Sequence, residues 1–340
     1  MIELQNDSLT FWFPEVHPDA WLEIEFQRTL RIPDDGTDYP LPAGLGPFPL
    51  QHVDDHVRTV PGHWLEHGGV MLPMYQAEAM WIDFASHYID DRETSYPFAV
   101  KIAAGKIDAV SGNGWMDRLH QSPQNYVVIP EQPWLDGFCV EQGVIRQFVA
   151  MPLGEGYTAE EQITGRAEFG GLQIMAYPMK REAFERNHPV VDGRVCYDMS
   201  MDVTCLDSPS AEMGLGAGGR MRQQIYDDPY DFQDWDLESH RRCFVHLTNS
   251  HRWQQITGQQ PPSQPPTAQT YQQAGVPWFD HYREQPVVAG SPVLRGLKSV
   301  VALDKEKNEQ TAIKNDPIVI DNAVQLRAAL APGQVREGTF

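Results

Sequence analysis

Hydrophobic and polar positions alternate along much of the chain. Residues 21–32 read WLEIEFQRTLRI, with most apolar side chains on one parity and the charged or polar ones on the other. A period of two residues is typical of a β-strand that buries one face. We therefore predict a strand there, and other apolar runs predict strands over 126–129, 143–151, 172–177, 195–204 and 317–320. A hairpin is predicted over 96–110, with Gly105 near its turn.

Fewer segments have the spacing of a helix. Apolar residues recur at helical intervals over 50–60 and stop before Pro61, and a run over 73–88 has the strongest helical pattern in the chain. The sequence TAEE at 158–161 matches a capping box, so a short helix is predicted to begin there and to end at Gly165. A last short helix is predicted near 322–330.

These elements predict an α+β fold that is dominated by β structure. Its sheets are expected to be mixed or antiparallel, with a few short helices and long loops rich in Pro and Gly, of which the chain has 27 each. The sequence GQQPPSQPPTAQT, which begins at Gly258, predicts a semi-rigid spacer. We therefore expect a main domain over 1–257, a Pro-rich spacer over 258–270 and a C-terminal extension over 271–340 that packs on the main domain.

Composition and charge exclude two classes of partner. The 340 residues include 47 acidic and 26 basic side chains, a formal net charge of −21, which disfavours nonspecific binding to nucleic acids and to anionic membranes. No window contains about 18 consecutive apolar residues, and no signal peptide is recognised. The four cysteines form no CxxC pair, which favours buried thiols in a reducing compartment. We therefore predict a soluble cytoplasmic protein whose partner is a protein or a small molecule.

A glycine-rich segment at 213–222, MGLGAGGRMR, is the first candidate site. It formally matches the dinucleotide fingerprint, but the nearest predicted strand ends near residue 204, too far away for that motif. Exposed backbone N–H groups followed by two arginines favour an anion-binding loop, with Gly216, Gly218, Gly219, Arg220 and Arg222 as its residues. The alternative is a flexible loop whose arginines neutralise the acidic residues that follow.

Histidines and acidic residues supply two candidate cation sites. His52, His56, His63 and His67 form two H-x3-H pairs, a spacing that places two imidazoles on one side of a helix and that would hold a divalent metal ion as cofactor. The alternative is that they are surface or capping residues. The acidic residues between 227 and 238 offer oxygen ligands for calcium, and a solvated acidic face is the alternative there.

Three stretches of the sequence resemble a family of uncharacterised proteins, some of which are labelled membrane proteins. The stretches are PEQPWLDGFCVEQGVIRQFVAMPLGEGYTAEEQITG, GGRMRQQIYDDPYDFQDWD and AGVPWFDHY. The resemblance extends over about residues 21–300. It implies no activity, substrate or catalytic residue, and the hydropathy of the chain does not fit the membrane label.

Two functions remain open at this stage. The first is a binding or scaffold protein, because catalytic motifs are missing and many aromatic residues fall in predicted loops. The second is an enzyme that uses a metal at 52–67 or an anionic small molecule at 213–222. Whether the four histidines converge in space is the observation that discriminates between them.

Overall fold

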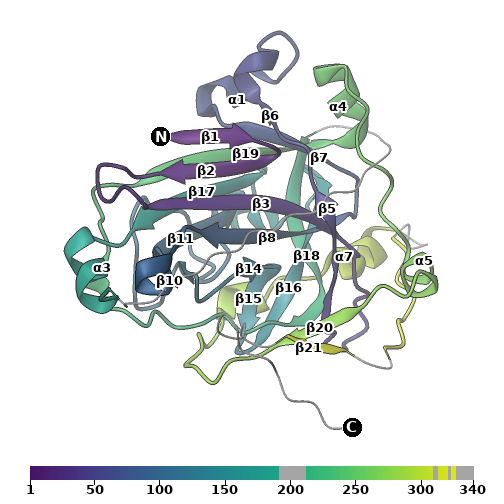
Figure 1. Cartoon of the computed structure of the whole chain (residues 1–340). Coiled ribbons are helices and arrows are strands. Elements are labelled where there is room, and N and C mark those ends of the chain that lie inside the picture. Colours follow the sequence, from purple (N-terminus) through teal and green to yellow (C-terminus); the bar gives the residue numbers. More distant parts are fainter. Residues whose placement is uncertain (191–211, 309–312, 321–322, 327–340) are drawn as a thin grey trace.

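A large, mostly antiparallel β-sheet forms the centre of the molecule (Figure 1). The computed structural model describes residues 1–190, 212–308, 313–320 and 323–326. Within these residues the large sheet has sixteen strands, and its main path runs β1-β2-β3-β8-β16-β18-β19-β17-β11-β12. Its strands are β1 (Ile2–Gln5), β2 (Ser8–Trp12), β3 (Trp21–Thr29), β5 (Gly44–Pro47), β6 (Gln51–His52), β7 (Val70–Met74), β8 (Ala79–Ser86), β11 (Phe98–Ala104), β12 (Ile107–Asp108), β13 (Val127–Ile129), β14 (Trp134–Leu135), β15 (Gly137–Glu141), β16 (Val144–Pro152), β17 (Leu172–Pro178), β18 (Glu212–Arg222) and β19 (Arg241–Asn249).

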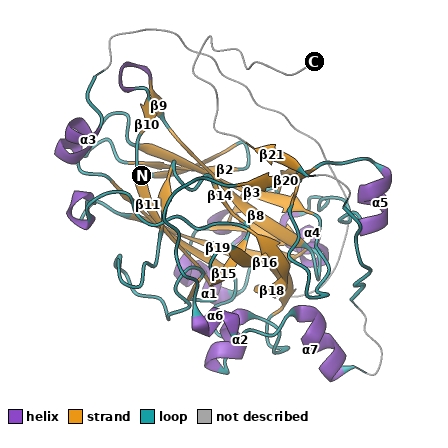
Figure 2. Cartoon of the chain, turned by 90° about the horizontal axis from the view of Figure 1, so that it is seen from below, coloured by secondary structure: helices purple, strands orange, loops and turns teal. Residues whose placement is uncertain are grey.

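The remaining elements are short and lie around this sheet (Figure 2). Small sheets are formed by β9 (Tyr88–Ile89) with β10 (Thr94–Ser95), and by β4 (Leu41–Pro42), β20 (Trp278–His281) and β21 (Val324–Leu326). The helices are α1 (Gly62–His67), α2 (Ala159–Thr164), α3 (Arg181–Asn187), α4 (Ser250–Thr257), α5 (Ala268–Gln273), α6 (Pro292–Arg295) and α7 (Val300–Lys307). Single 3-10 turns are η1 (Val53–His56), η2 (Asp90–Arg92) and η3 (Phe232–Asp234). The predicted β-dominated α+β fold is therefore confirmed.

The alternation in the first long strand packs one of its faces into the core. In β3, Leu22, Ile24 and Phe26 are fully buried, whereas Glu23 and Glu25 on the other face are only half-buried. The strand pairs antiparallel with β8, so that Ile24 lies opposite another apolar residue of the core. Burial of one parity stabilises this pairing, because a slip by one residue would move every apolar side chain to the outer face.

Several local predictions are confirmed. The hairpin over 96–110 consists of β11 and β12, and Gly105 adopts the positive φ of +57° that its turn requires. Thr158 caps α2, with the reciprocal hydrogen bonds of a capping box to Glu161, and Gly165 ends the helix in the left-handed conformation. The strands predicted over 126–129, 143–151 and 172–177 are present as β13, β16 and β17.

The strongest predicted helix, over 73–88, is wrong. This segment contains the end of β7, a turn and the strand β8, in which Met80 and Ile82 face the core and Trp81 and Asp83 face outwards. Residues four apart lie on the same side of both a helix and a strand, so the apolar spacing fits either element. Pairing with β3 and β16 decides in favour of the strand.

Other predictions near the ends of the apolar runs also need correction. Over 50–60 the chain forms β6 and one 3-10 turn, and Val57 is 55% exposed, so no buried apolar face stabilises a longer helix there. Residues 317–320 form no strand, and 324–326, predicted as helix, form β21. The strand predicted over 195–204 lies outside the described residues.

The chain after residue 258 is held to the main sheet by specific contacts. The buried guanidinium of Arg28 forms two hydrogen bonds with Glu78, at 2.7 and 2.8 Å, and also donates to Ser263. The hydroxyl of Tyr75 donates to the carbonyl of Pro262 at 2.8 Å. Further along, β20 pairs with β4, and Ser299, the N-cap residue of α7, forms a bridge to Ala217 of β18. The domain limits at 257 and 270 stay a prediction.

Candidate functional site

The predicted anion-binding loop at 213–222 is a strand. It forms β18, which pairs with β16 along nearly its whole length and is mostly buried. Its glycines permit close packing: a Cβ at Gly219 would lie 2.2 Å from the carbonyl oxygen of Pro33, and one at Gly216 would lie 2.8 Å from that of Tyr157. The prediction of a loop is therefore wrong, and Gly216, Gly218 and Gly219 are placed inside a sheet.

The two arginines of this strand form ion pairs with other segments. Arg220 Nε lies 2.6 Å from Asp38 Oδ1, and its Nη2 lies 3.1 Å from Glu141 Oε2. Arg222 lies 2.8 Å from Asp280 Oδ1 and donates to the carbonyl of Asp38 at 2.7 Å. Both guanidinium groups thus connect β18 to acidic residues, including one on β20, and this role differs from the predicted anion site.

The four predicted metal ligands lie on different short elements. His52 belongs to β6, and His56 ends η1 with its Nε2 3.5 Å from Gln51 Oε1. His63 Nε2 lies 3.2 Å from Glu212 Oε2, and the ring of His67 stacks on Phe244 with centroids 4.8 Å apart. Across the described ranges, no group of three or more His, Cys, Asp or Glu side chains has a geometry that could hold a metal ion.

A fifth histidine, His246, explains part of this arrangement. It is 1% exposed on β19, stacks on Trp64 with centroids 4.5 Å apart, and has its Nε2 3.0 Å from the carbonyl oxygen of Gly68. Burial lowers the pKa of His246 to about 3, so the ring is neutral. Helix α1 is thus held against β19 by stacked rings, in which His67 takes part.

The acidic residues of 227–238 accept hydrogen bonds inside the protein. Asp228 Oδ2 accepts from the hydroxyl of Tyr126 at 2.6 Å and from the indole of Trp235 at 2.8 Å. Asp234 accepts from Arg186 at 2.6 Å and from Asn187 at 3.0 Å. These two carboxylates stabilise the fold of their own loop, which is a structural role rather than the calcium site considered from sequence.

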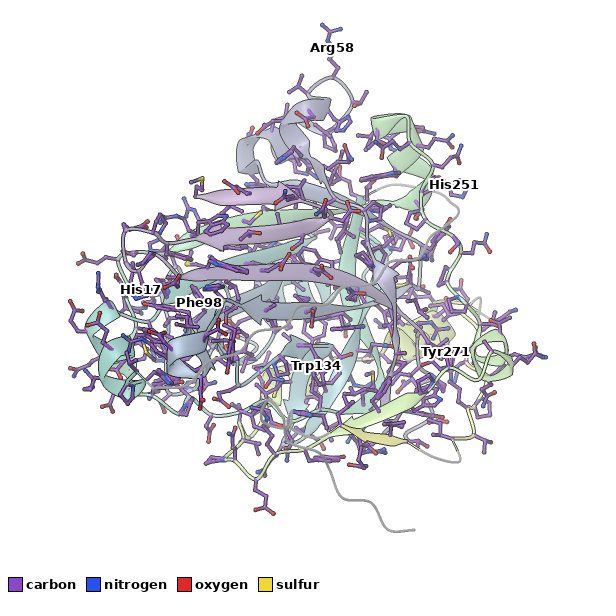
Figure 3. The ribbon with its side chains drawn as sticks, in the orientation of Figure 1. His17, Arg58, Phe98, Trp134, His251 and Tyr271 are labelled. Atoms are coloured by element: carbon purple, nitrogen blue, oxygen red, sulfur yellow. The ribbon has the colours of Figure 1, made fainter. Side chains whose placement is uncertain are left out.

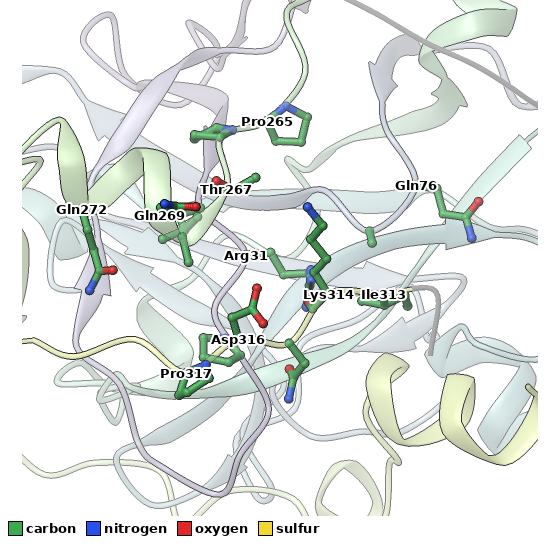
Figure 4. A pocket seen from close by; sticks show the side chains of 16 residues that line it. Arg31, Gln76, Pro265, Thr267, Gln269, Gln272, Ile313, Lys314, Asp316 and Pro317 are labelled. Carbon is green, nitrogen blue, oxygen red and sulfur yellow. Dashed lines mark hydrogen bonds between the residues drawn. The ribbon is translucent and has the colours of Figure 1, made fainter. Parts of the chain in front are cut away.

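A large cavity lies where β3 ends, beside the Pro-rich segment and residues 313–317 (Figure 4). Its volume is about 770 Å³. Its walls come from four stretches that are far apart in the sequence, and the lining residues are Leu30, Arg31, Pro33, Gln76, Ala77, Pro265, Pro266, Thr267, Ala268, Gln269, Gln272, Ile313, Lys314, Asn315, Asp316 and Pro317. None of these residues was a predicted site residue.

Arg31 is the central charged group of this cavity. Its Nη2 donates to the backbone carbonyl of Lys314, and no carboxylate within the described residues forms an ion pair with it. The nearby Asp34 is engaged elsewhere, with Arg146 Nη1 at 3.2 Å and with the hydroxyl of Ser299. Burial lowers the pKa of Arg31 to about 10, so the guanidinium is still charged at neutral pH. The cavity therefore contains a half-buried cation that has no anionic partner among the described residues.

Other polar side chains of the cavity add to its positive character. Lys314 carries a second positive charge, Asp316 is the one acidic side chain among the lining residues, and Gln76 and Gln269 add amide groups. Figure 4 shows Arg31 and Lys314 in the middle of this group, with Gln76 and Gln272 on opposite sides. Gln272 is partly engaged, because its Nε2 donates to the carbonyl of Val319 at 2.9 Å.

Sequence reasoning missed Arg31 because it reads as an ordinary polar residue near the end of a strand. Its surroundings come from residues 76, 265–272 and 313–317, and no local pattern connects these stretches. The sequence does indicate the Pro-rich segment that forms one wall of the cavity, but its composition predicts a spacer and not a binding site.

Comparisons with known proteins complete the description. Within the described residues, none of the helices has the length and apolar character that crossing a bilayer requires. The resemblance to a family of uncharacterised proteins stays a prediction. Comparison of the chain with protein-family models, with curated proteins and with solved structures gives no match.

Proposed function

We propose that this protein binds a small organic or inorganic anion, with one carboxylate or phosphate group, in the cavity around Arg31. The observation that carries the proposal is a half-buried guanidinium that lines the cavity and lacks a carboxylate partner among the described residues. Burying an unpaired charge is costly, and proteins normally offset this cost with a counter-charge. An anionic ligand would supply that counter-charge.

The size and the charge of the cavity support a small ligand. A volume of about 770 Å³ falls within the range of about 300–1,000 Å³ that is typical of small-molecule sites. Two cationic residues and one acidic residue give the described part of the lining an excess of one positive charge, which fits a single carboxylate or phosphate rather than a polyanion. This local excess is the opposite of the overall charge of −21, so the cavity is a distinct electrostatic environment.

Four polar lining residues have a defined role in this proposal. The planar fork of Arg31 would form a bidentate contact with two ligand oxygens, which an ammonium group cannot do. Lys314, which is exposed, would attract the ligand and contact it as a point charge. The amides of Gln76 and Gln269 would orient the rest of the ligand.

The buried free thiols Cys139 and Cys243 are consistent with the proposed cytoplasmic location.

The proposal is tested by thermal unfolding of the full chain with and without inorganic phosphate, succinate or citrate at matched ionic strength. A ligand that binds the native state at about 100 times its Kd stabilises it by about 2.7 kcal/mol, which raises Tm by several degrees. We expect such a shift for at least one of these anions in the wild type, and its loss in Arg31→Gln.

Arg58→Gln is the matched control, because it removes the same charge from an exposed loop far from the cavity (Figure 3). It should keep the ligand-dependent shift. Arg31→Lys should retain part of it, since the charge remains but the fork is lost. Equal shifts in the wild type and in Arg31→Gln, or no shift with any of the three anions, would contradict the proposal.

A further inference from the structure

A second cavity, separate from the one around Arg31, lies on the outward face of β8 and β14. Its volume is about 190 Å³, and most of its walls are apolar. The walls include Pro42, Trp81, Trp134, Asp136 and Phe279. The Trp81 and Trp134 rings have centroids 6.4 Å apart and meet edge to face at 72°, so the two rings form a corner. Figure 3 shows Trp134, a residue of β14, near the centre of the molecule.

The pairing of the strands places two carboxyl groups beside these indoles. In the β8–β14 pair, Trp134 lies opposite Asp83 and Leu135 lies opposite Ile82. The next pair in the same register would be Asp136 with Trp81, on the same face of the sheet as Trp134 and Asp83. Glu25 of β3 is the direct cross-strand neighbour of Asp83 on the other side. Acidic side chains thus cluster on the same outward face as two tryptophans.

The two aspartates lack cationic partners in the described part of the chain. Asp136 is 2% exposed, and its Oδ2 accepts a hydrogen bond from Gln223 Nε2 at 2.8 Å. Burial, and in second place repulsion from Glu25, raises the pKa of Asp83 to about 7. Burial also raises the pKa of Asp136 to about 7, with Asp83 as a repulsive neighbour. Both carboxyl groups therefore lie where a positive charge would be favourable.

Two cationic side chains that lie near β20 in the described residues are already paired. Arg222 of β18 binds Asp280 of β20 at 2.8 Å, and Arg283 binds Glu131 at 2.8 Å. His281 has its ring 5.1 Å from that of Trp134, and burial lowers its pKa, so it does not supply a charge at neutral pH. Both ring nitrogens of His281 and the indole N–H of Trp81 are buried without a hydrogen-bond partner among the described residues.

We propose that this second cavity binds the headgroup of a small alkylammonium cation, with the cation against the faces of Trp81 and Trp134 and its charge balanced by Asp136 and Asp83. A corner of aromatic rings with a nearby carboxylate is the arrangement that attracts quaternary ammonium groups. The volume is below the range of about 300–1,000 Å³ of most ligand pockets, which fits a headgroup. A neutral sugar would stack on the same rings but would leave the two carboxyl groups uncompensated. The unpartnered N–H of Trp81 suits a ligand that also has an oxygen acceptor, as choline does.

The test is a titration of the full chain with choline chloride, in which binding is measured by calorimetry and by tryptophan fluorescence. The uncharged isostere 3,3-dimethylbutan-1-ol and glucose serve as comparison probes. We expect choline to bind at one site and the uncharged isostere to bind at least about tenfold more weakly. Equal binding of choline and its isostere, binding of glucose without choline, or no saturable binding of choline would each overturn the proposal.

Variants connect the binding to this cavity. Asp136→Asn keeps an oxygen that accepts from Gln223 and should weaken choline binding about tenfold, and Trp81→Leu should do so to a similar extent. Trp12→Leu is the matched control, because Trp12 lies on β2 outside the cavity, and it should change the affinity by less than about twofold. If Asp136→Asn does not fold, Asp83→Asn provides the same test of charge. Unchanged affinity in both the aspartate and the Trp81 variants contradicts the site.

The pH dependence and the independence of the two cavities provide further readouts. Because the carboxyl groups must ionise to bind a cation, choline affinity should rise about tenfold between pH 6 and pH 8 if one group with a pKa near 7 controls it. The groups that face Asp136 and Asp83 are Trp134, Gln223, Glu23 and Glu25, together with His281 next to Trp134. Arg31→Gln should leave choline binding unchanged, so failure of the anion proposal does not decide this one.

Discussion

At the scale of single residues, the interior contains charged side chains in two different situations. Arg28 is buried and forms two hydrogen bonds with Glu78, so both charges are compensated. Arg31, three residues further along the same chain segment, donates a hydrogen bond to a backbone carbonyl and forms no ion pair within the described residues. Asp83 is the acidic counterpart, a half-buried carboxyl group among other acids. Unpaired charges such as these cost stability, which is why they point to ligands.

Replacement of Asp83 by Asn should stabilise the protein in a pH-dependent manner. The folded pKa of about 7 is above the ordinary value of about 3.9, so the folded state retains a proton that the unfolded state releases. Stability is therefore lost as pH rises from about 4 to about 7, and Asp83→Asn removes this loss. We expect a gain of about 1–3 kcal/mol at pH 8 and a smaller one at pH 5, measured by urea unfolding.

The exposed residue Asp54 supplies the control for this experiment. Asp54→Asn should change the free energy of unfolding by less than about 0.5 kcal/mol at both pH values. A destabilising effect of Asp83→Asn at pH 8, or an effect that grows as the pH falls, would show that the carboxylate is favourable in the folded state.

At the scale of elements, a sequence pattern predicts the secondary structure correctly where that pattern occurs in one type of element. The alternation in β3 and the capping box of α2 identified those elements, because each pattern reflects contacts within the element or with its direct neighbour. The pattern over 73–88 and the glycines of β18 were misread, because their meaning depends on distant strands. Glycines usually indicate a loop, but in β18 they permit close approach of Pro33 and Tyr157.

A single methyl group in β18 should therefore be costly. Gly219→Ala places a Cβ 2.2 Å from the backbone oxygen of Pro33, and backbone atoms cannot move aside as a flexible side chain can. We expect a loss of about 1–3 kcal/mol or more in the free energy of unfolding. Gly62→Ala, at the start of α1 and with no atom within 4 Å of the added Cβ, should change it by less than about 1 kcal/mol. Similar values for the two variants in urea unfolding would refute the packing role assigned to β18.

At the scale of the whole molecule, the candidate sites are products of the tertiary fold. The cavity around Arg31 combines the end of β3, the turn after β7, the Pro-rich segment and residues 313–317. The second cavity combines β8, β14, β20 and the segment around β4. The sequence predicts the β-rich architecture correctly, but its candidate metal and anion sites lie in contiguous motifs, at 52–67 and 213–222. Those residues turned out to make ring stacks, ion pairs and sheet contacts, whereas the unpaired charges lie between segments that meet only in the folded chain.

Anion binding at Arg31 is tested most directly with a crystal of the full chain soaked in selenate, an oxyanion whose selenium is located by anomalous scattering. We expect an anomalous peak inside the cavity, with selenate oxygens about 2.7–2.9 Å from the guanidinium nitrogens of Arg31. The same soak of Arg31→Gln crystals should show no peak at that position. Selenate found only at exposed cations such as Arg58, with none in the cavity around Arg31, would contradict anion binding there.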